Sequence, residues 1–446
     1  MVTQTNLYAT QVLINTEDVA SSSRLHGWNP TDRQEMKKFL GMLGYMGLVK
    51  MPNIRHYWRS KPLYKNWVST VMSRNRFELL LKLWHFTNNE ECPEGDRLYK
   101  VEPFVDMIVQ NFQNIYTPGE VFCVDESLIP FRGKLLMKQY IPMKAHKYGV
   151  KVFKLCSSGG YTWNLKIYGG KVATPGMSVP TKVVLSLSEN LLNSGRTVVT
   201  DNFYTSLELA NILLDKQTHL LGTLRSNRRG NPKDVISKKL KVGELIAKEN
   251  ARGICVIKWK DKRDVLMLST KHNAATVEIQ RRNATIRKPV AIVDYNTGKS
   301  SIDVSDQMAS YNTALRKTIK WYRKISIEIL LGTSIVNAHF LYKEVTKKTI
   351  SITEFREMII TDLLNLNEEE KRPAVMSSTS RKRRNTHTFA KKEGPAAKVR
   401  KYCRGCYIKK QRSNAHKNTV KKVTTYCLDC DDQPHYCLDC FTESHK

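Results

Sequence analysis

Three short segments, far apart in this 446-residue chain, each carry an aspartate at the edge of an expected helix or strand. They read VDESLIPFRG at 124–133, TDNFYTS at 200–206 and IDVSDQM at 302–308. Carboxylates are hard oxygen ligands that suit Mg²⁺ or Mn²⁺. If the fold brings Asp125, Asp201 and Asp303 together, they can hold two such ions, which activate an attacking oxygen and stabilise a leaving one. The pattern predicts metal-dependent chemistry on phosphodiesters.

The charge of the chain points to the same kind of substrate. Lysine and arginine number 73 against 41 aspartates and glutamates, a formal net charge of +32. A field of this sign attracts nucleic acid, because binding releases the counterions condensed on the phosphates. No uninterrupted apolar run approaches the roughly 20 residues that cross a bilayer. The polar N-terminal stretch has no hydrophobic signal core, so we expect no membrane partner.

The cysteines fall into two sets. Six of the ten lie between residues 403 and 440, and four are scattered along the chain. This distribution favours a terminal metal site plus reduced thiols over a disulfide scaffold, and it predicts an intracellular protein. The scattered cysteines are Cys92, Cys123, Cys156 and Cys255.

The C-terminal cysteines form three CxxC pairs, with histidines among and after them. Pairs of this spacing are typical of tetrahedral zinc sites. Six cysteines and two histidines make eight ligands, enough for two Zn²⁺ ions in an interleaved cross-brace, and metal binding would supply much of the folding free energy. The eighth ligand is either His435 or His416, of which His435 is preferred. The predicted ligands are Cys403, Cys406, Cys427, Cys430, His435, Cys437, Cys440 and His445.

The order of expected elements predicts an α/β multidomain protein. Residues 1–118 have helical periodicity, with a cap-like helix start at residues 31–35 and another helix start at Ser73. Residues 119–224 then read as strand, hairpin, helix, strand, helix, strand, the order of a ribonuclease-H-like core. The remaining expected segments are a β-rich insertion at 225–290, the second part of the core at 291–310 with a strand at 291–295, helices at 311–366, a basic linker at 367–400 and the cysteine-rich domain at 401–446.

Several of these segments together resemble the piggyBac transposase family. The block from Asp125-Glu126 to Phe131-Arg132-Gly133 matches a family pattern, as do residues 140–144, 147–149, 201–206, 222–228 and 303–308. Arg316, Lys317 and Trp321 fall where the family has a basic pair and a tryptophan. The resemblance extends over nearly the whole chain.

The resemblance implies a cut-and-paste DNA transposase of the DDD type, with two Mg²⁺ or Mn²⁺ ions at Asp125, Asp201 and Asp303 and with Asp306 as a nearby fourth acid. It implies end cleavage through a DNA hairpin and insertion at TTAA. It also implies a homodimer, a single domain for dimerisation and end binding built from the helices on both sides of the core, and a zinc module that binds transposon-end DNA. Glu126 is left out of the metal site, because neighbouring strand residues face opposite ways.

Basic and aromatic residues near these motifs are candidate DNA contacts. Arg225 and Arg228 follow an expected central strand and can hold phosphates, as can Arg316 and Lys317. Trp321 is either a packed helix residue or a platform on which an unpaired base stacks. The clusters Arg381-Lys382-Arg383-Arg384 and Lys391-Lys392 predict nuclear import, or a DNA-binding linker, or both.

Two other functions compete with an active transposase. The first is a domesticated transposase-derived DNA-binding protein, which the absence of the family's long acidic N-terminal tail favours and the three retained acids oppose. The second is a zinc-dependent ubiquitin ligase, which explains the cysteines and leaves the acids and the charge unexplained.

Overall fold

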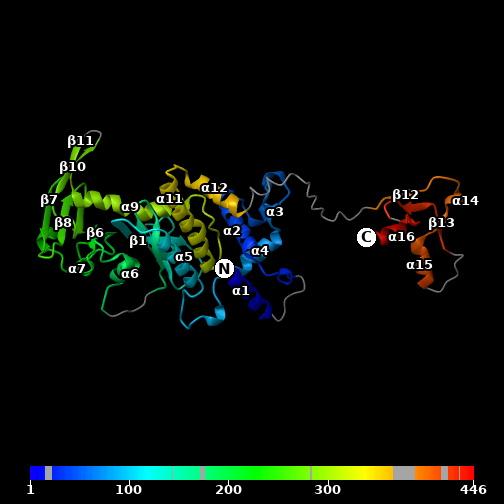
Figure 1. The fold of residues 1–446 in the computed structure, drawn as a ribbon, viewed down its shortest axis with the longest axis horizontal. Helices are drawn as coiled ribbons and strands as arrows, with labels where there is room; N and C mark the ends of the chain where they lie inside the picture. The colour runs from blue at the N-terminus through cyan, green and yellow to red at the C-terminus, as the bar shows by residue number, and fades with distance from the viewer. Residues whose placement is uncertain are drawn as a thin grey trace. The chain divides into compact units, whose positions relative to one another are not determined.

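The computed structural model describes two compact units, Met1–Glu369 and Glu370–Lys446 (Figure 1). The described residues are 1–15, 23–142, 144–170, 176–281, 284–364, 387–412, 420–430 and 432–445.

Helices from both ends of the first unit pack together. In α2, the Asp32 side chain accepts the first-turn N–H of Glu35 at 2.7 Å, which confirms the expected cap. Gly41 of the same helix faces Leu364 so closely that an added Cβ would lie 2.8 Å from that side chain, so the C-terminal end of α12 rests directly on α2. The helices are α1 (Val2–Ile14), α2 (Arg33–Leu48), α3 (Val68–Val71), α4 (Arg74–Leu83), α5 (Glu102–Ile115), α10 (Trp321–Glu328), a π-helical turn η6 (Ile329–Thr333), α11 (Ser334–Thr346) and α12 (Ile352–Leu363).

A nine-stranded mixed sheet forms the centre of the described part of this unit, in the order β2-β3-β1-β5-β6-β9-β8-β7, with β4 pairing β3. Strand β1 is antiparallel to β3 and parallel to β5, and β5 is parallel to β6. The strands are β1 (Val121–Pro130), β2 (Lys138–Tyr140), β3 (Tyr148–Ser157), β4 (Thr162–Ile167), β5 (Thr197–Thr200), β6 (His219–Thr223), β7 (Leu245–Glu249), β8 (Cys255–Lys260) and β9 (Asp264–Ser269).

Helices cover both faces of the sheet. The long helix α9 (Val290–Ser310) packs with Cys123, Val199 and other residues of one face. The opposite face belongs to the main core, with α6 (Val179–Ser188) and α7 (Leu207–Asp215). The short helix α8 (Lys233–Ser237) lies beside β7 and β8.

The expected strand at 291–295 is wrong, since these residues form the first turns of α9. The buried positions of α9, which include Ala291, Tyr295, Gly298 and Ile302, recur at helical spacing. Gly298 is required by close packing, because a Cβ there would lie 2.8 Å from Cγ2 of Val199.

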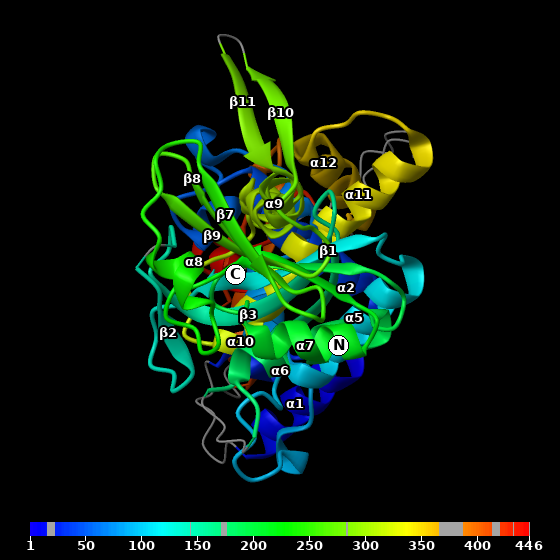
Figure 2. The same cartoon turned by 90° about the vertical axis from the view of Figure 1, so that its left-hand side faces the viewer.

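The residues expected as a β-rich insertion form strands that continue the main sheet, since β9 pairs with β6. They then form a hairpin of β10 (Thr276–Arg281) and β11 (Ala284–Pro289), which pairs only within itself among the described strands. The hairpin projects away from the rest of the unit and leads into α9 (Figure 2).

One helical stretch, Trp321–Thr346, is long and apolar enough by length and composition to cross a membrane, and most of it is buried in the protein. Arg323, Lys324 and Glu328 interrupt this stretch, so it is not an uninterrupted apolar run. Its burial is typical of a core helix of a folded domain.

The second unit is small and contains little regular structure. Residues 387–391, expected in a linker, belong to it, because β12 pairs with β15. Its elements are β12 (Phe389–Lys391), α14 (Ala396–Val399), β13 (Lys401–Tyr402), α15 (Arg404–Arg412), β14 (Lys422–Val423), β15 (Thr425–Cys427) and α16 (Leu438–Ser444). The basic cluster at 381–384 and His416 lie outside the described residues.

Candidate functional site

Asp125 and Asp201 lie at the same edge of the sheet. The parallel register pairs Val124 of β1 with Thr200 of β5, so the two aspartates lie at the same level, each directly after one residue of this pair. Residues two apart on a strand share a face. Cys123 and Val199 pack in the core cluster that includes α9, so Asp125 and Asp201 start from the α9 side of the sheet.

Asp303 approaches from α9, where its side chain is exposed. The charges of all three acids act on the buried thiol of Cys123: burial raises its pKa, and Asp125, Cys156, Asp303 and Asp201 raise it further. Among the described residues, however, the three carboxylates are not a group whose oxygens all lie within 4.8 Å of one another. The three predicted acids therefore lie in one region of the unit, in a looser arrangement than that of a closed metal site.

The two strand-end acids lack enough neighbouring positive charge. Burial raises the pKa of Asp125 to about 7, and the charges of Glu126 and Asp201 add to the effect. Burial also raises the pKa of Asp201. Buried carboxylates disfavour their charged form unless a cation compensates them. The donor set and this uncompensated charge fit a divalent cation bound to hard oxygen ligands.

Glu126 directs its carboxylate away from this site, as expected. Tyr204, buried in the core on the other side of the sheet, donates its hydroxyl to Glu126 at 3.1 Å. Lys151 forms an ion pair with the same carboxylate at 3.5 Å. Through these two partners, Glu126 links β1 to β3 and to the loop after β5, which is a structural role.

Asp306, the predicted fourth acid, is held by two residues of the sheet. Its Oδ1 accepts a hydrogen bond from Ser127 Oγ at 2.7 Å and lies 2.8 Å from Nζ of the buried Lys154. Lys154 is the register partner of Asp125 across β1 and β3. An ion pair therefore occupies one oxygen of the acid that the sequence prediction gave to the metal.

Three basic side chains border the carboxylates. Lys144 donates to the carbonyl of Glu126 at 2.8 Å, and its charge opposes the rise of the Asp125 pKa. Arg225 donates to Asn202 Oδ1 at 3.0 Å, directly after Asp201 in the chain. Arg228 donates to the carbonyl oxygens of residues 202 and 203. The predicted pair Arg225 and Arg228 is thus brought to the site.

The other predicted DNA contacts, Arg316, Lys317 and Trp321, lie in the segment before α10 and at its first residue. The Arg316 guanidinium stands 5.5 Å from the ring centroid of Tyr57 and 3.3 Å from its hydroxyl. Lys317 is exposed. Trp321, the first residue of α10, is partly buried against the main core, as expected of a packed helix residue.

The second unit contains two groups of four side chains that could each hold a metal ion. The first group is formed by Cys403, Cys406, Cys437 and Cys440, with sulfur–sulfur distances of 3.6–3.8 Å. A tetrahedron with Zn–S bonds of about 2.3 Å has edges of about 3.8 Å. The first group therefore already has the spacing of a zinc site.

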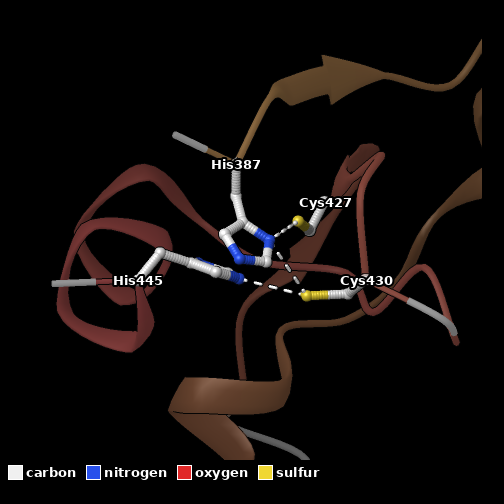
Figure 3. Close-up of side chains that lie close together, drawn as sticks. All are labelled: His387, Cys427, Cys430 and His445. Carbon is white, nitrogen blue, oxygen red and sulfur yellow. Dashed lines mark hydrogen bonds between the residues drawn. The ribbon is translucent and has the colours of Figure 1, made fainter. Parts of the chain in front are cut away.

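The second group consists of His387, Cys427, Cys430 and His445 (Figure 3). Cys430 Sγ lies 3.2 Å from His445 Nε2 and 3.4 Å from His387 Nδ1, which itself lies 3.3 Å from Cys427 Sγ.

His435, the preferred eighth ligand in the sequence prediction, belongs to neither group. Its ring is buried, and its Nδ1 lies 3.2 Å from the carbonyl oxygen of Val423. The structure places His387 in that position instead, because β12 pairs with β15 and brings the two segments together.

Comparisons with known proteins place the chain in a family. The family model described as Transposase IS4 matches residues 1–339. The chain belongs to the piggyBac-type transposase family.

Human piggyBac transposable element-derived protein 3 is 26% identical over 349 residues, covering 74% of this chain and 58% of that protein. Human piggyBac transposable element-derived protein 2 is 26% identical over 389 residues, covering 82% of this chain and 63% of that protein. The chain thus spans about three fifths of the length of these relatives. A piggyBac transposase synaptic complex with hairpin DNA, solved by cryo-electron microscopy, matches with a TM-score of 0.72 and 25% identity, covering 99% of this chain and 94% of that chain.

In this piggyBac-family chain, sequence reasoning missed His387 and the ion pair of Asp306. His387 lies 16 residues before the first CxxC pair, within a charged segment expected as linker. The nearby Phe389 is an apolar residue in this charged segment and could have indicated a folded part of the chain. In the structure its ring lies 4.7 Å from that of Phe441. The ion pair of Lys154 with Asp306 could not be predicted from the sequence, because only the packing of α9 on the sheet brings the two residues together.

Proposed function

We propose that this protein is a cut-and-paste DNA transposase that cleaves and rejoins phosphodiesters at the Asp125–Asp201 edge of its sheet. The observation that carries the proposal is the meeting of these two acids at the ends of adjacent parallel strands, with Asp303 approaching from α9. Membership of a transposase family supports it. So does the likeness to a transposase solved as a synaptic complex with hairpin DNA.

The strand arrangement supports a ribonuclease-H-like core. Strands β4, β3, β1, β5 and β6 lie side by side in this order, the first three antiparallel and the last three parallel. In this proposal β7–β9 are an addition to the edge of that core.

Asp125, Asp201 and Asp303 would hold two Mg²⁺ or Mn²⁺ ions, which when bound supply an activated attacking oxygen and a stabilised leaving oxygen. The protein itself draws the DNA strand to the site. Arg225, Arg228 and Lys144 offer positive charge within the same region, where phosphate contacts fix the register of the strand. Ser127 and Lys154 hold Asp306, and so fix α9 against the sheet at the turn that follows Asp303.

The proposed reaction follows the family: a nick at each transposon end, attack of the freed 3′-hydroxyl on the opposite strand to form a hairpin, hairpin opening, and insertion at TTAA. Each step is an in-line phosphoryl transfer with a different nucleophile. We further propose a homodimer that pairs the two ends, two Zn²⁺ ions in the second unit, and action in the nucleus.

Excision of a TTAA-flanked donor carrying the element's own ends, in the presence of Mg²⁺, tests the proposal. Wild type should excise, Asp201→Asn should not, and Asp261→Asn, in the exposed turn between β8 and β9, should match wild type. Excision by Asp201→Asn at the wild-type rate would refute the site.

A domesticated DNA-binding protein is the second candidate. The curated relatives are named as derived from transposable elements. Wild type that binds end DNA with nanomolar affinity and never cleaves it, in Mg²⁺ or Mn²⁺, would favour this second function.

A further inference from the structure

The C-terminal end of α9, the helix that carries Asp303, lacks the glycine that commonly caps a helix. The residue that follows the helix, Tyr311, is extended. The last four carbonyl groups of a helix have no partner inside it. In α9, the carbonyl of Gln307 accepts a hydrogen bond from the Ser310 hydroxyl at 2.7 Å. The two carbonyls between these residues need a donor from another element.

Arg356 of α12 supplies that donor. Its Nη2 donates to the carbonyl oxygen of Met308 at 3.5 Å and to that of Ala309 at 3.4 Å. Its Nη1 donates to the carbonyl of Leu331, in the π-helical turn η6. The side chain is 2% exposed. One buried guanidinium therefore joins α12 to both η6 and the last turn of α9.

A second side chain of α12 holds the turn that follows α9. Asn312 in this turn has a positive φ of 54°, and its side-chain amide donates to the Thr353 hydroxyl at 2.9 Å. Thr353 is three residues before Arg356, so the two side chains lie on the same face of α12. This face of α12 thus contacts both the end of α9 and the turn after it.

The charge and the shape of Arg356 both suit this position. A cation near the C-terminus of a helix interacts favourably with the helix dipole. Burial lowers the pKa of the guanidinium, the charge of Glu328 opposes this shift, and an arginine stays protonated in proteins. A lysine would keep the charge, but its ammonium is a single point and lacks the planar fork that reaches carbonyls on two elements.

The hold on the end of α9 bears on the acids that the helix carries. Asp303 lies five residues before Met308 and Asp306 two residues before it, which are distances of about 7 Å and about 3 Å along the helix axis. Over so short a length a displacement of the helix end also displaces both carboxylates. Catalytic and metal-binding groups must be held to within about 0.5 Å of their productive positions.

We infer that Arg356 is a positioning residue for the divalent-metal site, which it influences through α9 and the carboxylates of Asp303 and Asp306. This role rests on the proposed function. Residues that orient metal ligands without touching the metal typically change the metal affinity by about 10–100-fold when they are replaced. Arg356→Lys should therefore weaken metal binding about tenfold, at the lower end of this range.

The probe is Mn²⁺ alone, titrated into the full-length protein without DNA. Electron paramagnetic resonance measures the signal of the free ion, and the dissociation constant follows from its loss. Asp201→Asn measures the ions that bind outside the carboxylate site. Arg356→Lys should raise the dissociation constant of the remaining ions about tenfold, at a temperature at which urea unfolding shows that the variant is folded.

Arg323→Lys is the matched control. Arg323 is also buried, at 6% exposed, and donates to the carbonyls of Leu81, Lys82 and Trp84 at the C-terminal end of α4. It therefore does for α4 what Arg356 does for α9. Its lysine variant should lose a similar amount of stability and bind Mn²⁺ as wild type does.

Arg356→Gln, which keeps a planar amide and removes the charge, is the second variant and should also weaken Mn²⁺ binding. Wild-type affinity in a folded variant at position 356, or an equal loss of affinity in Arg323→Lys, would overturn the inference. Failure of both position-356 variants to fold would give Arg356 a purely structural role and would overturn it too. Wild-type Mn²⁺ binding by Asp201→Asn would instead remove the metal site of the proposed function.

Discussion

The substitution Asp125→Asn should stabilise the protein in the absence of divalent ions while abolishing cleavage. Burial and two neighbouring acids raise the pKa of Asp125 from 3.8 to about 7 in the folded state. A raised carboxyl pKa contributes stability that is fully present below the unfolded-state value and is lost as the pH rises through the folded-state value. At pH 8 the folded protein therefore carries the full cost of ionising this group.

The difference of about 3 units corresponds to about 4 kcal/mol at 1.36 kcal/mol per unit, which is an upper limit because local relaxation reduces the cost. Asparagine keeps the shape and the acceptor oxygen that now receives the Glu126 N–H at 2.8 Å. We expect the variant to gain about 1–3 kcal/mol of unfolding free energy at pH 8, and this gain to shrink toward zero near pH 4.

Urea unfolding followed by tryptophan fluorescence, at pH 8 and pH 4.5 without Mg²⁺, measures this gain. Adding Mg²⁺ should stabilise wild type, because an ion that binds only the folded state adds to its stability, and should have little effect on Asp125→Asn. Asp261→Asn is the control. An Asp125→Asn variant as stable as wild type, or less stable, at pH 8 without Mg²⁺ would refute the electrostatic reasoning.

Three further outcomes are expected. Lys154→Ala should lower the unfolding free energy by about 1–3 kcal/mol, less than for a fully buried pair, because the Asp306 carboxylate that loses its partner is 36% exposed; a thermal or urea unfolding curve like that of wild type would contradict this. His387→Ala should reduce the zinc content from about two ions per chain to about one, whereas His435→Ala should keep two; elemental analysis showing the reverse would restore His435 as the eighth ligand. Arg225→Ala should weaken DNA binding at all sequences and reduce the salt slope by about 1, and a slope equal to that of wild type would place this arginine outside the phosphate contacts.

Much of the central fold could be predicted because its signals are local. The Asp32 cap, the hairpin of β3 and β4, and the strand before Asp201 all follow from turn residues and short apolar runs. The strand expected at 291–295 is instead helical, because the short apolar run before Gly298 belongs to a longer stretch whose buried positions recur at helical spacing. Position 298 of this helix is a glycine because the sheet approaches α9 there too closely for a side chain.

The candidate sites show the same division between local and distant information. The positions of Asp125 and Asp201 could be predicted because strand ends of a parallel pair meet at one edge. His387 could not, since its membership of the second metal group depends on the pairing of β12 with β15. Nor could the pairing of Lys154 with Asp306, which are 152 residues apart in the chain.

The interleaving of the two cysteine and histidine groups has a consequence for protein synthesis. The first group needs Cys437 and Cys440, and the second needs His445, so neither can close until the last stretch of the unit has left the ribosome. Domains that can fold from the N-terminus onward do so during translation, whereas this unit must wait. During that interval Cys403 and Cys406 lack the ligands that complete their group, and exposed thiols are open to oxidation. If both groups bind zinc, as proposed, the supply of zinc and the reducing power of the cell during translation would set the yield of this unit.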